Sequence, residues 1–142
     1  MRIRVVLDAN IYASALMKAE GSPAKVLHTI ISSEEYELVL SKDIQDELKR
    51  ILFYPKIRSR IKRTDEDLLK WMDALSILGH IVVPKYKYDV LVKEDPDDDI
   101  YLIAAIEGKA SYIVSGDNHL LKMESFENIQ LLTAAAFLQQ FS

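Results

Sequence analysis

Acidic side chains gather where apolar stretches of this sequence begin or end. Five of the six residues at 94–99 are acidic, and an apolar run at 100–106 follows them. Asp8 comes directly after the first apolar run, and Asp117 ends a Ser-Gly-Asp stretch that follows a later one. Carboxylate oxygens are hard ligands, so converging acids could bind Mg²⁺ or Mn²⁺. Each motif alone is equally consistent with a helix start or a turn.

Four ionised carboxylates at one place would repel one another strongly. Two of them about 5 Å apart, at an effective dielectric constant of about 20, repel by roughly 3 kcal/mol. Four form six pairs, which gives roughly 15–20 kcal/mol in total. That energy reaches or exceeds the stability of a typical domain. Acids that converge must therefore hold protons or bind a cation.

Strands and helices are predicted to alternate along the chain. Apolar runs predict strands at Ile3–Leu7, 36–40, 81–83, 112–114 and 129–132. Capping residues and helical spacing predict helices that follow Ser22-Pro23, Ser41, Thr64, Asp98 and Thr133. Strands separated by helices indicate βα units. We therefore predict one α/β domain over residues 1–142, with a central parallel sheet in a three-layer α/β/α arrangement.

The acids fall where ligand sites form in such a sheet. Asp8 and Asp117 both follow predicted strands, and ligands bind beyond the carboxyl ends of strands where the strand order reverses. Glu47 borders the apolar face of its predicted helix and can reach the sheet edge, and Asp98 begins the buried helix. The candidate catalytic and metal-ligating residues are Asp8, Glu47, Asp98 and Asp117. The candidates to hydrogen-bond these ligands or water are Asn10, Ser115 and Asp95. Turn and cap roles explain Asn10 and Ser115 equally well.

A basic segment follows Glu47 in the sequence. Residues 49–63 include seven basic side chains and no acid, with Phe53 and Tyr54 among them. Such a segment can follow the phosphates of a single strand while an aromatic ring stacks on a base. The candidate RNA-binding residues are Arg50, Lys56, Arg58, Arg60, Lys62 and Arg63. A solvated helix face and loop is the alternative interpretation. The net charge of −4 argues against a nonspecific basic coat.

The composition restricts the cellular compartment that we expect and the side chains that could bind a metal. The sequence contains no cysteine, which excludes disulfides and thiolate ligands and fits a reducing compartment. Asp8 interrupts the first apolar run too early for a signal peptide, and no uncharged stretch of about 18 residues exists. We therefore expect a cytoplasmic protein with no membrane span.

Together these residues resemble the PIN-domain family. The resemblance rests on Asp8-Ala-Asn after the first strand, Glu47 in Asp-Glu-Leu, Asp98 in Asp-Pro-Asp-Asp-Asp, and Ser-Gly-Asp117 before Leu-Leu. It covers the whole chain. It implies a metal-dependent endoribonuclease with Mg²⁺ or Mn²⁺, commonly the toxin of a toxin–antitoxin pair. The expected partners are an RNA substrate, a cognate antitoxin and a second copy of the chain. Asn118-His119 departs from the family, because many relatives place another acid after Gly-Asp.

Two other functions are consistent with parts of the pattern. A haloacid-dehalogenase-type phosphatase also has an aspartate after its first strand, but it needs a second one where this chain has Asn10, and no lysine is well placed. A non-catalytic PIN-like module that binds RNA or protein would keep the same acids. Metal-dependent RNA cleavage separates these possibilities. His119, beside Asp117, is either a general acid or a solvated loop histidine.

Overall fold

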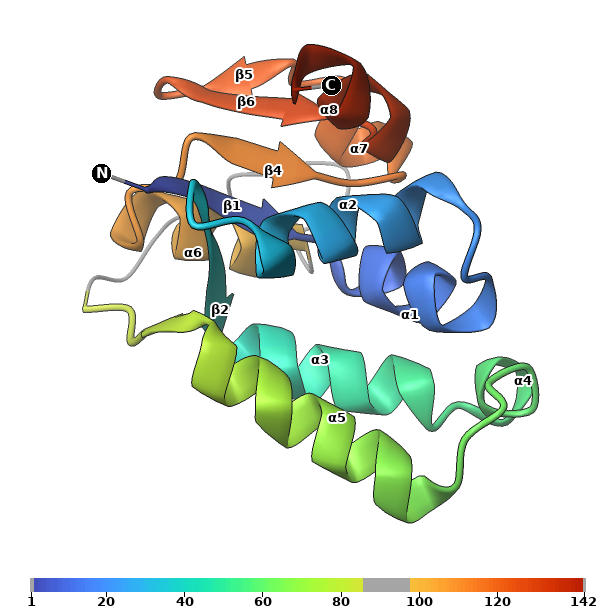
Figure 1. Cartoon of the computed structure of the whole chain (residues 1–142). Coiled ribbons are helices and arrows are strands. Elements are labelled where there is room, and N and C mark those ends of the chain that lie inside the picture. The colour runs from blue at the N-terminus through green and yellow to red at the C-terminus, as the bar shows by residue number, and fades with distance from the viewer. Residues whose placement is uncertain (1, 86–97, 142) are drawn as a thin grey trace.

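Helices separate most of the strands along the chain (Figure 1). The computed structural model describes residues 2–85 and 98–141. The elements are β1 (Ile3–Leu7), α1 (Ala9–Met17), α2 (Ser22–Ser32), β2 (Tyr36–Ser41), α3 (Lys42–Leu52), α4 (Pro55–Arg58), α5 (Asp65–Leu78), β3 (His80–Val82), α6 (Asp99–Glu107), β4 (Tyr112–Val114), α7 (Asn118–Leu121), β5 (Ser125–Phe126), β6 (Ile129–Leu132) and α8 (Ala134–Phe141). The mainly parallel sheet with flanking helices confirms the predicted α/β/α fold.

The strands of the described chain form one sheet in the order β3-β2-β1-β4-β6-β5. β1 pairs in parallel with both β2 and β4, and β5 runs antiparallel to β6 at the edge. The chain builds outward from β1 to β3 and then returns to the other side of β1 with β4. The strand order therefore reverses between β1 and β4, where ligand sites form. Leu7 is in register with Val114, so Asp8 and Ser115 leave the sheet side by side.

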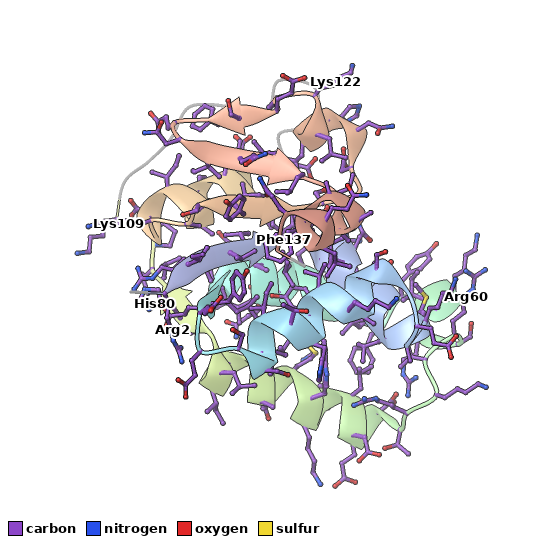
Figure 2. The ribbon with its side chains drawn as sticks, turned by 45° about the horizontal axis from the view of Figure 1, so that its top comes forward. Arg2, Arg60, His80, Lys109, Lys122 and Phe137 are labelled. Atoms are coloured by element: carbon purple, nitrogen blue, oxygen red, sulfur yellow. The ribbon has the colours of Figure 1, made fainter. Side chains whose placement is uncertain are left out.

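Helices pack on both faces of the sheet. α6 contacts β1, β2 and β4, whereas α2 contacts β2 and α8. Figures 1 and 2 show α6 on one side of the central strands and α2 on the other. α6 is apolar nearly all round and is buried at Leu102, Ala104 and Ala105, as expected for a helix in the interior.

Helix α6 ends against β2 at a glycine. Gly108 is buried, and its carbonyl oxygen accepts a hydrogen bond of 2.9 Å from the Arg4 guanidinium. A Cβ atom added there would lie 2.7 Å from Val39 Cγ1 and 2.8 Å from the Ala104 carbonyl oxygen. Residue 108 therefore lets the end of the helix approach the strand closely.

Several helix ends match the sequence prediction and others do not. The hydroxyl groups of Ser41, Thr64 and Thr133 accept hydrogen bonds from backbone N–H groups three residues later, which confirms those caps. The predicted cap at Ser22 is wrong, because α2 begins at Ser22 and Gly21 precedes it without a side-chain bond. No pattern in the sequence predicted α1, α4 or the antiparallel strand β5.

Candidate metal centre

Asp8 joins the end of β1 to the start of α1. Its side chain is 2% exposed, and its Oδ1 atom accepts a hydrogen bond of 3.1 Å from the Asn10 N–H group. The Oδ2 atom accepts a bond of 2.7 Å from the Ser115 hydroxyl. Burial raises the pKa of Asp8, and the nearby Asp117 carboxylate raises it further, although these hydrogen bonds oppose the rise. An ionised Asp8 is thus disfavoured unless positive charge is near.

Ser115 connects the acid after β1 with the acid after β4. Its side chain is fully buried, and its oxygen accepts a hydrogen bond of 2.9 Å from the Asp117 N–H group while its hydroxyl donates to Asp8. The Asp117 Oδ1 atom in turn accepts a bond of 2.7 Å from the His119 N–H group and caps α7. The serine thereby fixes the relative positions of two acids that come from neighbouring strands.

Asp98, Asp117 and His119 form a cluster of possible metal ligands. One ligating atom from each residue lies within 4.8 Å of the other two. Asp98 is 9% exposed and directly precedes α6. The His119 Nδ1 atom lies 3.8 Å from Asp117 Oδ1. These three side chains, from the amino-terminal ends of α6 and α7, could share one divalent ion.

Tyr101 lies among the acids, although the sequence analysis did not select it. Its hydroxyl oxygen accepts a hydrogen bond of 3.2 Å from the Ala9 N–H group, and the same hydroxyl lowers the pKa of Asp8. Burial raises the pKa of Tyr101, and the carboxylates of Asp8, Glu47 and Asp98 raise it further. Three of the predicted acids therefore raise the pKa of the same phenol. In the sequence, the feature that could have indicated this position is the hydroxyl of Tyr101, the one polar side-chain group in the apolar run at 100–106.

Glu47 lies at the border of this arrangement. Its side chain is 30% exposed on α3, and both carboxylate oxygens contact the Arg50 guanidinium, with Nε 3.1 Å from Oε2. Glu47 and Asp8 are not members of the cluster formed by Asp98, Asp117 and His119 within the described residues. The Glu47 carboxylate nevertheless contributes to the raised pKa of Tyr101, which connects Glu47 to the same group of residues.

Asn10, Ser115 and Asp95 were predicted to hydrogen-bond the metal ligands, and their positions differ. The Asn10 side chain belongs to an exposed residue, and the bond to Asp8 comes from the Asn10 backbone, which any residue except proline could supply. Asp95 lies outside the described residues. Of the three neighbours predicted to contact the ligands, Ser115 makes a side-chain hydrogen bond to one of them.

The basic segment at 49–63 divides into two groups of side chains. Arg58 is bound internally, because its guanidinium contacts Asp65 at 2.8 Å and the Ile61 carbonyl oxygen at 3.1 Å and lies over the Phe53 ring. Arg50 is paired with Glu47. The other predicted RNA-binding residues are exposed and are Lys56, Arg60, Lys62 and Arg63. Figure 2 shows Arg60 extending from the end of the molecule that carries α4.

The donor set fits a divalent cation. It combines carboxylate oxygens with one imidazole, and the buried carboxyl of Asp8 lies beside them with a pKa that is raised chiefly by desolvation. A nearby cation would offset both the desolvation of Asp8 and its repulsion from Asp117.

Over the part of the chain that is described, the helices are too short or too polar for any of them to cross a lipid bilayer.

Two comparisons relate the chain to known proteins. A family model described as PIN domain matches residues 4–119, which include all of the acids discussed above. The chain is also 30% identical to an uncharacterised protein of Methanocaldococcus jannaschii, over 99% of this chain and 93% of the relative. The region matched by the family model, residues 4–119, includes most of the sheet and all three members of the cluster formed by Asp98, Asp117 and His119. The chain belongs to the PIN-domain family.

Proposed function

We propose that this protein is a metal-dependent endoribonuclease that cleaves single-stranded or structured RNA at the acidic edge of its sheet. The catalytic and metal-ligating residues of the proposal are Asp8, Glu47, Asp98 and Asp117. The observation that carries it is the buried Asp8, which Ser115 connects to Asp117 beside the Asp98 carboxylate. Membership of the PIN-domain family supports it, since PIN domains are generally nucleases and typically use divalent metals.

The proposed ion is Mg²⁺ or Mn²⁺, held by Asp98 and Asp117 with Asp8 next to them. When bound, such an ion supplies Lewis-acid chemistry to a phosphodiester and its attacking water. The protein's own contribution is to hold the carboxylates in place. Ser115 donates to Asp8 and accepts from the Asp117 backbone. Preorganised charges of this kind avoid rearrangement during the reaction.

Glu47 has a different role in the proposal. Its carboxylate is more exposed than those of Asp8 and Asp98 and is oriented by Arg50. A carboxylate at the rim of the site can accept a hydrogen bond from the attacking water and orient it toward the phosphate. Arg50 then acts by fixing Glu47 in position.

The RNA strand is proposed to lie along the exposed part of the basic segment. Lys56, Arg60, Lys62 and Arg63 can each contact phosphates, and Tyr54, which is 56% exposed, can stack on an unpaired base. Their position directly after α3, which carries Glu47, supports a continuous path from this surface to the acids. Arg58 is assigned to holding the loop after α4, because its contacts are internal.

The biological role that we propose is that of a toxin in a toxin–antitoxin pair. The acidic motifs that resemble the toxin-like PIN domains support this, and the absence of cysteine from the sequence supports a cytoplasmic site of action. A cognate antitoxin is the proposed protein partner. Co-purification with the product of the adjacent gene, together with loss of cleavage on its addition, is the expected result.

We also propose that the chain forms a homodimer. Ile77 is 83% exposed near the end of α5, and Val83 is 78% exposed just after β3. Large apolar side chains this exposed on neighbouring elements are suited to contact with a second copy. Light scattering should give twice the chain mass, and the double variant Ile77→Lys/Val83→Lys should give the mass of one chain.

The decisive test is RNA cleavage by the purified protein with and without EDTA. We expect a fluorescent single-stranded RNA to be cut with Mg²⁺ or Mn²⁺, to remain intact with EDTA, and to remain intact with Asp98→Asn. Asp46→Asn is the matched control, because Asp46 is an exposed acid on α3 that pairs with Lys42. RNA binding without cleavage under all metal conditions would instead identify a non-catalytic module.

A further inference from the structure

A histidine stands at the metal-binding edge where many PIN domains carry an acid. We propose that His119 is a nitrogen ligand of the bound ion, and that the mixed nitrogen–oxygen donor set makes the site prefer Mn²⁺ to Mg²⁺. The inference rests on the proposed metal site. It goes beyond that site by assigning a ligand of another chemical class and a choice between two metals.

The backbone holds His119 close to the acids. Asp117 caps α7 and accepts the His119 N–H group at 2.7 Å, so the two residues are fixed relative to each other. Leu120, the next residue, is fully buried and anchors the short helix. The imidazole itself extends to the surface, with a side chain 45% exposed. It is therefore anchored at its base and accessible to an ion from solvent.

The distances allow one ion to be shared. The His119 Nδ1 atom lies 3.8 Å from Asp117 Oδ1, and the ligating atoms of Asp98, Asp117 and His119 all lie within 4.8 Å of one another. Two donors on opposite sides of an ion, each at about 2.1 Å, are about 4.2 Å apart. The spacing of the three ligating atoms is therefore close to what the ligands of a single ion require.

The preference follows from the type of donor and not from charge. Mg²⁺ and Mn²⁺ carry the same charge, so the carboxylates of Asp8, Asp98 and Asp117 attract both ions equally to first order. An imidazole nitrogen is a softer ligand, which transition metals accept more readily than Mg²⁺. Replacing an acid by histidine therefore lowers the affinity for Mg²⁺ more than the affinity for Mn²⁺.

Histidine at this position also reduces the repulsion within the site. A neutral imidazole adds a donor without adding a negative charge to three carboxylates that are already close. An aspartate there would add like-charge repulsion with each of its acidic neighbours. His119 is thus compatible with a site whose acids are as buried as Asp8 and Asp98.

The experiment compares Mn²⁺ binding by untagged wild-type protein, His119→Asp and His28→Asp. His28 is the matched control, because it is an exposed histidine on α2 that lies beside Ser32. Electron paramagnetic resonance measures free Mn²⁺ and gives the affinity, and competition with Mg²⁺ gives the selectivity. Pulsed measurements on the bound ion detect magnetic coupling to a ligand nitrogen.

We expect nitrogen coupling in the wild type and in His28→Asp, and none in His119→Asp. The preference for Mn²⁺ over Mg²⁺ should fall roughly tenfold in His119→Asp and stay unchanged in His28→Asp. Tight Mn²⁺ binding by the wild type without nitrogen coupling would overturn the role of His119 alone. Failure of the wild type to bind Mn²⁺ would overturn the proposed metal site and this inference with it.

Discussion

Tyr12 and Tyr101 are both buried, but only the second hydroxyl is tied to the acidic site. The Tyr101 hydroxyl accepts a hydrogen bond from the Ala9 N–H group and lowers the pKa of Asp8. The Tyr12 hydroxyl is fully buried and has no hydrogen-bond partner among the described residues, and its ring packs edge-on against Trp71 at 6.3 Å between centroids. The two side chains therefore provide a matched pair for testing whether a phenol positions Asp8.

Tyr101→Phe should weaken Mn²⁺ binding several-fold and cost about 1–3 kcal/mol of unfolding free energy, because it leaves the buried Ala9 N–H group without its acceptor. Tyr12→Phe should leave Mn²⁺ binding unchanged and should not destabilise the protein, because it removes an unsatisfied buried hydroxyl. Metal titration and denaturant unfolding measure both quantities. Equal effects of the two substitutions would show that Tyr101 acts only through packing.

Asp8 gives the metal-free protein a specific dependence on pH. Its pKa in the folded state is raised above the usual value for an aspartate, chiefly by burial. The folded state therefore holds this proton more tightly than the unfolded state. The contribution to stability is complete below the unfolded pKa and is lost as the pH rises through the folded pKa.

Asp8→Asn should remove that part of the pH dependence. In EDTA, unfolding free energies measured from pH 3 upward should decline less for the variant than for the wild type, and at pH 7 the variant should be at least as stable. Adding Mn²⁺ at pH 7 should raise the melting temperature of the wild type more than that of the variant, by mass action. A metal-free variant that is clearly less stable at pH 7 would contradict the desolvation argument.

Sequence patterns predicted which acids lie near one another at the candidate site better than they predicted the contacts of individual side chains. Asp8, Asp98 and Asp117 were predictable because each lies within three residues of an apolar run. Tyr101 was hidden inside an apolar run, where a tyrosine is ordinarily a packing residue. The internal contacts of Arg58 depend on Asp65, which lies in the next helix, and sequence spacing does not reveal such a pairing.

At the scale of elements, the glycine that ends α6, at the opposite end of that helix from Asp98, differs in its requirements from the glycine between Ser115 and Asp117. A Cβ at Gly108 would collide with Val39 and with the Ala104 carbonyl oxygen, whereas a Cβ at Gly116 would meet nothing within 4 Å. No glycine among the described residues has a positive φ. Gly108→Ala should therefore cost about 1–3 kcal/mol of unfolding free energy through overpacking.

Gly116→Ala is the control and should change stability by less than about 0.5 kcal/mol. Chemical denaturation of the two variants in EDTA is the measurement, since metal binding would otherwise contribute to stability. A strongly destabilised Gly116→Ala would show that the loop between Ser115 and Asp117 needs glycine for a reason that the structure does not contain.

The elements that sequence analysis did not predict have identifiable causes. Helix α1 begins directly after β1, because Asp8 both ends the strand and caps the helix, and no separate start signal precedes it. The hairpin between β5 and β6 turns at Glu127 and Asn128, both with positive φ. Two-residue turns of this kind usually contain Asn-Gly or Asp-Gly, whereas this turn contains no glycine.

At the scale of the whole molecule, charge is distributed unevenly around a net value of −4. The exposed cations of the basic segment lie at the α4 end, and Figure 2 shows Arg60 and Lys109 at opposite ends of the molecule. If RNA follows the basic segment, replacing its exposed cations should reduce the salt dependence of binding, whereas a distant cation should contribute little.

The triple variant Lys56→Gln/Arg60→Gln/Lys62→Gln, made in the cleavage-deficient Asp98→Asn background, should bind single-stranded RNA more weakly. The slope of log affinity against log salt should fall by roughly 0.7 for each lost phosphate contact. Lys109→Gln in the same background should leave the slope unchanged. Titrations at several salt concentrations measure these slopes, and an unchanged slope in the triple variant would remove the basic segment from the RNA path.

The hydrogen bond between Ser115 and Asp8 spans 107 positions of the chain. Protein synthesis releases residues from the amino end first, so Asp8 and Glu47 emerge long before Ser115 and Asp117 exist. The candidate metal centre cannot be complete until β4 has paired with β1 and the segment through residue 119 has folded. A nascent chain still being translated past β2 or β3 therefore lacks the centre, which places any cleavage activity after the segment through residue 119 has been made.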